Sequence, residues 1–126
     1  MNVKLLRKVK RHILAEPKRL YMPAYIIRKE DGMDISRPFA RCGTAACIAG
    51  WTYILSVKSK TPPRTGDEHT EAAELLGLTE LQADRLFLPG NWPLDFRDGL
   101  TGDGKPETAK VAAARIEFFI KTKGKK

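Results

Sequence analysis

The sequence predicts a mainly α, compact single domain of about five helices that covers residues 1–126. Its length of 126 residues suits one hydrophobic core and is too short for two. With 42% apolar and 30% charged residues, the chain has enough apolar surface to fold around such a core. Apolar residues recur at helical spacing in several segments, and Pro and Gly separate these segments, which favours helices over strands.

The first helix is expected at residues 3–15, and Pro17 ends it. On a helical wheel its apolar residues share one face, which is made by Leu5, Leu6, Val9 and Ile13. The opposite face is basic and carries Lys4, Arg7, Lys8 and Arg11. A short β-hairpin is expected near residues 24–36, because residues 25–27 and 33–35 flank Asp31-Gly32, a pair that suits a tight turn.

The segment Thr44–Leu55 is apolar on every side and rich in small residues, which is typical of a central, buried helix. Two capping-box patterns, Thr65 to Glu68 and Thr79 to Gln82, predict a helical hairpin over 66–76 and 80–87 with Gly77 at the turn. Residues 88–105 are expected to be irregular. Pro106 begins a last helix that runs to about Thr122, and the tail 123–126 is expected to be frayed.

Charge is distributed unevenly along this basic chain, which carries a net charge of +8. Residues 1–60 hold thirteen basic and four acidic residues, whereas residues 61–100 hold three basic and eight acidic ones. The helical hairpin at 66–87 resembles a helix-turn-helix, but its net acidic character opposes contact with phosphates, so a purely structural hairpin is favoured.

The basic face of the first helix is the better candidate for an anionic partner. Six residues form this candidate binding site, namely Lys4, Arg7, Lys8, Arg11, Lys18 and Arg19. Clustered bases of this kind predict binding to nucleic acid or to an acidic protein surface. The alternative is a solvated face, or one that pairs with the acidic segment 67–84.

The two cysteines, Cys42 and Cys47, lack the spacing and the partners of a zinc site, so no metal and no cofactor is expected. Cys42 follows Arg41 and precedes the expected helix at 44–55, a setting that lowers the pKa of a thiol. A thiol-dependent enzyme that uses Cys42, with His69 as its base, is therefore the alternative function. Trp92 is interpreted as a core plug or, if exposed, as an anchor for a partner.

No membrane-spanning helix is expected. The longest run without a charged residue, Cys42–Val57, would span about 24 Å as a helix, which is shorter than the bilayer core of about 30 Å. Basic residues also interrupt the apolar residues at the N-terminus, so no signal peptide is expected and a cytoplasmic location is favoured. The sequence does not indicate an oligomeric state.

Several short blocks of the sequence, taken together, resemble those of one protein family. They are the Cys-Gly-Thr-x-x-Cys-x-Ala-Gly-Trp block at 42–51, residues 72–78, residues 83–87, Trp92-Pro93 and residues 113–120. Together they resemble a family of small uncharacterised proteins from bacteria and their phages. The resemblance implies a bacterial or phage cytoplasmic setting and an accessory or anti-defence role, and it implies no catalytic residue. We therefore expect a small non-enzymatic protein that binds a macromolecular partner through its basic N-terminal helix.

Overall fold

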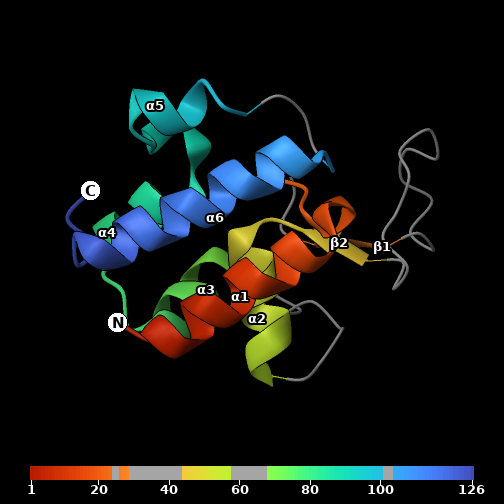
Figure 1. Cartoon of the computed structure of the whole chain (residues 1–126). Coiled ribbons are helices and arrows are strands. Elements are labelled where there is room, and N and C mark those ends of the chain that lie inside the picture. The colour runs from red at the N-terminus through yellow and green to blue at the C-terminus, as the bar shows by residue number, and fades with distance from the viewer. Residues whose placement is uncertain (24–25, 29–43, 58–67, 101–103) are drawn as a thin grey trace.

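A computed structural model of the chain describes residues 1–23, 26–28, 44–57, 68–100 and 104–126. It is mainly helical, as predicted, with six α-helices in these ranges. They are α1 (Val3–Ala15), α2 (Ile48–Val57), α3 (Glu68–Leu76), α4 (Glu80–Phe87), α5 (Leu94–Arg97) and α6 (Pro106–Lys121). Two short 3-10 helices, η1 (Pro17–Arg19) and η3 (Pro89–Asn91), and two strands, β1 (Ile26–Arg28) and β2 (Thr44–Ala46), complete the described elements (Figure 1).

Helix α1 spans the predicted residues 3–15, because the signals at its two ends and the pattern of its apolar residues define the same segment. The side-chain oxygen of Asn2 accepts a hydrogen bond of 3.0 Å from the backbone N–H of Leu5, which caps the first turn. The predicted apolar face, Leu5, Leu6, Val9 and Ile13, is buried. Pro17 follows at the start of η1 and stops the helix.

The predicted helix at Thr44–Leu55 is wrong at its start. Residues Thr44–Ala46 form β2, which pairs antiparallel with β1 and places Ile26 opposite Ala46. Helix α2 begins only at Ile48 and is the buried central helix that the apolar run predicted. One strand of the expected hairpin is thus β1, but its described partner is β2, and residues 33–35 lie outside the described residues.

The hairpin of α3 and α4 forms as predicted over its described part. The hydroxyl of Thr79 accepts from the backbone N–H of Gln82 at 3.2 Å, and the Gln82 side chain accepts from the Thr79 N–H at 3.0 Å, which completes the capping box. Gly77 ends α3 with a φ of 68° in the left-handed region, where glycine is favoured. The second capping pattern, at 65–68, begins outside the described residues.

The described part of residues 88–105 is more regular than predicted, because η3 and α5 are helical turns within it. The tail at 123–126 also differs from the frayed end that the sequence suggested. The N–H of Gly124 donates to the carbonyl of Phe119 at 2.9 Å, and the N–H of Lys123 donates to that of Ile120 at 3.0 Å. This pair of bonds closes α6 with a Schellman motif and buries Gly124.

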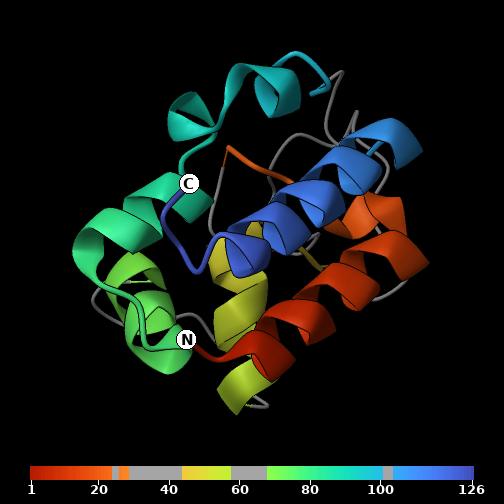
Figure 2. The ribbon, with the colours of Figure 1, turned by 60° about the vertical axis from the view of Figure 1, so that its left-hand side comes forward.

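Helices α1, α2 and α6 surround most of the core, and α3 and α4 close one side of it (Figures 1 and 2). Helices α1 and α6, from opposite ends of the chain, pack directly against each other. They run antiparallel, because the end of α1 and the start of α6 line the same pocket. The most basic segments of the sequence therefore lie side by side. In the described part of the chain, no helix has both the length and the apolar character needed to cross a membrane.

Candidate functional site

The basic residues predicted on the first helix are exposed on α1. Lys4, Arg7, Lys8 and Arg11 all lie on its solvent side. Lys4 and Arg11 make no ion pair with any described residue. The Lys8 ammonium group donates to the backbone carbonyl of Leu55 at 3.4 Å, which ties its stem to the end of α2. Lys4, Lys8 and Arg11 therefore have no acid paired with them among the described residues.

Glu117 of α6 is the acid that faces α1. Its Oε1 atom accepts from Lys10 Nζ at 2.7 Å and from Arg7 Nε at 3.2 Å. These hydrogen bonds, first that of Lys10 and then that of Arg7, lower the pKa of the Glu117 carboxyl group. One acid is therefore shared by two bases, and the local charge between the two helices remains positive.

Helix α6 adds two exposed bases, Lys110 and Lys121, to the same side. Because α6 runs antiparallel to α1, Lys121 lies toward the start of α1 and Lys110 toward its end. We call the surface that the two helices share the basic face and define it by six residues: Lys4, Arg7, Lys8, Arg11, Lys110 and Lys121. The two from α6 were missed in the sequence, because nothing in the sequence shows which helix packs beside α1.

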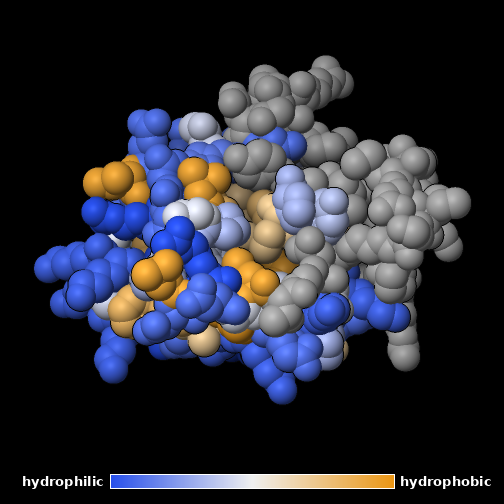
Figure 3. All heavy atoms as spheres, turned by 90° about the horizontal axis from the view of Figure 1, so that it is seen from above, coloured by the Kyte–Doolittle hydropathy of each residue, from blue (hydrophilic) through white to orange (hydrophobic). Residues whose placement is uncertain are grey.

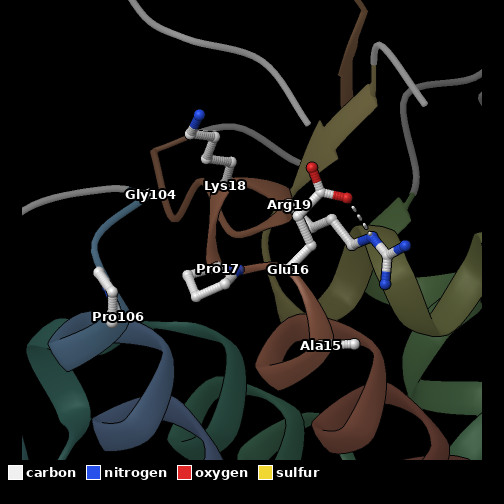
Figure 4. Close-up of a pocket in the computed structure, with 7 residues that line it drawn as sticks. All are labelled: Ala15, Glu16, Pro17, Lys18, Arg19, Gly104 and Pro106. Atoms are coloured by element: carbon white, nitrogen blue, oxygen red, sulfur yellow. Dashed lines mark ion pairs between the residues drawn. The ribbon is translucent and has the colours of Figure 1, made fainter. Parts of the chain in front are cut away.

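The remaining two predicted site residues, Lys18 and Arg19, lie in η1 at one end of this face. Arg19 is turned toward the protein, where its Nε atom pairs with Glu16 at 3.5 Å and its Nη1 donates to the carbonyl of His12 at 2.8 Å. Lys18 is exposed at the mouth of a pocket that Gly104 and Pro106 also line (Figure 4). Arg19 is thus committed to internal contacts, whereas Lys18 faces solvent.

His12 lies between the basic face and the core. Its ring meets that of Trp51 edge-on, with the ring centroids 4.3 Å apart. Burial, followed by the charge of Arg19, lowers the pKa of His12 to about 4. The imidazole is therefore neutral near pH 7 and adds no charge to the basic face.

The residues of the alternative thiol enzyme are only partly described. Cys42 lies outside the described residues, and its distance from His69 is not defined. His69 Nε2 lies 3.0 Å from Asp84 Oδ1, and the His69 ring packs edge-on against Phe87. Cys47 is buried, and burial raises the pKa of its thiol to about 11. Cys47 therefore stays protonated and is not a nucleophile near neutral pH.

Trp92 is a core residue and not an exposed anchor for a partner, because its side chain is only 2% exposed. Its indole Nε1 donates to the carbonyl of Leu86 at 2.8 Å, which ties η3 to α4. The Trp92 ring lies over Arg115, a fully buried base whose Nη2 donates to the carbonyl of Arg85 at 2.9 Å. Arg115 was missed, although its position three residues after Ala112 and four before Phe119 places it on the apolar stripe of α6.

The fold and this surface define a small helical domain with a continuous basic face. Comparisons with protein-family models, with curated proteins and with solved structures gave no match. The case for a function therefore rests on the geometry and charge of the chain itself.

Proposed function

We propose that this protein is a non-enzymatic binding module that holds an anionic macromolecule against its basic face. The observation that carries the proposal is the antiparallel packing of α1 on α6, which joins the basic ends of the chain into one surface. Its central acid, Glu117, is already paired with Lys10 and Arg7. A surface with this excess of positive charge attracts an anionic partner and speeds its association.

The placement of the acidic residues supports the same proposal. The acids of α3 and α4 form no ion pair with the bases of α6 among the described residues. One of them, Asp84, is held by His69, and the bases of α1 pair with none of them among the described contacts. The acidic segment 67–84 therefore leaves the basic face open, and the alternative of internal neutralisation loses its main support.

The test compares two variants with the same net charge. Lys4→Gln/Arg11→Gln removes two free bases from the basic face, and Lys125→Gln/Lys126→Gln removes two exposed bases from the tail. The probe is a DNA duplex of about 20 base pairs, used for its charge. We expect the first variant to bind the duplex more weakly. The slope of the logarithm of its binding constant against the logarithm of the salt concentration should decrease in magnitude by about 2.

The tail variant is expected to retain the affinity and the salt dependence of the unmodified protein. An equal loss in both variants would show that attraction follows net charge rather than this face, and the proposal would fail. Iodoacetamide labelling at pH 6 tests the thiol alternative separately. Rapid alkylation of Cys42 would support that alternative, and slow alkylation would count against it.

A further inference from the structure

A groove of about 550 Å³ crosses the exposed side of α6, next to the basic face. Its floor is Ala114, whose small side chain leaves a depression between larger neighbours. One wall includes Arg7 of α1, and the other includes Phe96 of α5. Figure 2 shows the arrangement that produces the groove, with α6 lying between α1 and α5.

The groove offers apolar contacts along much of its length. Phe96 and Phe118 pack together with their ring centroids 5.3 Å apart and their planes tilted by 42°. Both rings are only partly buried, and Ile120 adds a further apolar side chain. Seen from the side of α5, the surface carries hydrophobic residues among hydrophilic ones (Figure 3). The groove therefore suits a ligand that brings apolar side chains of its own.

One wall of the groove carries charged residues and the other an aromatic ring. Arg7 and Lys121 line it from the side of the basic face. On the other side, α5 contributes the apolar ring of Phe96 to the lining. A nucleic acid backbone is charged throughout and brings no apolar side chain to Phe96, Phe118 and Ile120. A helical peptide can instead turn its carboxylates to one wall and its apolar residues to the floor.

We propose that this groove binds an acidic amphipathic helix of a protein partner. The apolar side chains of that helix would fill the depression over Ala114 and contact Phe96 and Phe118. Its carboxylates would face Arg7 and Lys121, because Arg7, Lys10 and Lys121 together outnumber the single acid Glu117 at this wall. This inference rests on the proposed function and specifies its partner as a protein segment rather than a nucleic acid.

The test uses a synthetic helical peptide of about 18 residues, made of Glu and Leu with the leucines on one face. A scrambled peptide of the same composition serves as the control ligand. The variant Ala114→Gln fills the depression without changing the charge, and Gln is well tolerated in helices. Ala15→Gln, at an exposed alanine of α1 outside the groove, is the matched control.

We expect Ala114→Gln to weaken binding of the amphipathic peptide at least tenfold by fluorescence anisotropy. Binding of the scrambled peptide and of duplex DNA should not change, and Ala15→Gln should behave like the unmodified protein. Unchanged peptide binding by Ala114→Gln, or equal binding of the two peptides, or no binding of the amphipathic peptide, would overturn the groove assignment. If Lys4→Gln/Arg11→Gln also binds every probe normally, the proposed function itself fails.

Discussion

His12 lies where protonation of its ring is unfavourable. Its Nε2 atom is buried and has no hydrogen-bond partner among the described residues, and Arg19 Nη1 lies 3.3 Å from its Nδ1 atom. Protonation would place a second cation beside that guanidinium group in a partly dry site. The neutral ring instead packs against Trp51, so protonation of His12 would disturb the packing of the core.

The pKa of His12 predicts a loss of stability in acid. It is about 4 in the folded protein against 6.5 for the free side chain, so the unfolded chain binds the extra proton first. The free energy of unfolding should fall as the pH drops from 6.5 to about 4, by at most about 3 kcal/mol from this residue. Urea titrations at several pH values measure it. The variant His12→Phe should lose this part of the pH dependence, and an unaltered profile would contradict the assignment.

Arg115 is a buried base whose guanidinium group contacts aromatic rings and forms no ion pair with a described acid. Its guanidinium carbon lies 5.6 Å from the centroid of Phe119, 5.8 Å from that of Phe96 and 6.0 Å from that of Trp92. Burial lowers its pKa to about 10, so it remains charged at neutral pH. Its Nε and Nη1 atoms have no hydrogen-bond partner among the described residues. Part of the cost of burying it is therefore uncompensated.

Substitution of Arg115 should separate its packing from its charge. Arg115→Met keeps much of the volume and removes the buried charge, so we expect stability within about 1 kcal/mol of the unmodified protein, or above it. Arg115→Ala should cost about 3 kcal/mol, because it leaves a cavity under Trp92. Urea unfolding of both variants measures the difference. Equal destabilisation by Met and Ala would show that the charge and its bond to the Arg85 carbonyl matter more than packing.

At the scale of elements, the helices with an apolar stripe and a proline at one end were predictable from the sequence. Helix α1 has a four-residue apolar stripe and Pro17 as its stop. Helix α6 has Pro106 at its start and an apolar stripe that is buried except for Ile120, which is partly buried. In both cases local propensity and tertiary packing select the same residues, so the boundaries needed no knowledge of distant contacts.

The strand β2 could not be predicted in the same way. Residues 44–46 begin an apolar run that continues into α2, and an apolar run has no period that distinguishes a strand from a buried helix. The distinction comes from β1, whose residues lie almost twenty positions earlier in the chain and pair with Ala45 and Ala46. A parallel bridge from Leu20 to Ala46 adds to this pairing. Only the folded chain brings these segments together.

The same limit applies to the candidate site. The helical wheel placed Lys4, Arg7, Lys8 and Arg11 on one face, and all four are exposed. It could not show that Glu117 would be shared by Arg7 and Lys10, because that acid lies more than a hundred residues away. Surface ion pairs of this kind contribute less than about 1 kcal/mol, so their main effect here is on charge rather than on stability.

At the scale of the whole molecule, the two ends of the chain share one core. Helix α1 packs on α6, α2 packs on both α1 and α3, and α4 reaches α6. The N–H of Asn2 donates to the carbonyl of Leu76 at 2.7 Å, and Arg85 donates to the carbonyl of Gly124 at 3.2 Å. Terminal residues therefore hold the hairpin of α3 and α4 in place. We therefore expect the described helices to unfold together as one unit.

The two tryptophans give a direct test of the single domain expected over residues 1–126. Trp51 is buried near α1, where its indole donates to the carbonyl of Arg19 at 2.7 Å, and Trp92 is buried near α4 and α6. Trp51→Phe leaves a fluorescent probe in one region, and Trp92→Phe leaves one in the other. In each variant we expect the fluorescence and circular dichroism transitions in urea to coincide, because one cooperative unit exposes both regions together. If the fluorescence of either variant changes at a lower urea concentration than its helix signal, the chain contains two units, and the face shared by α1 and α6 could open without global unfolding.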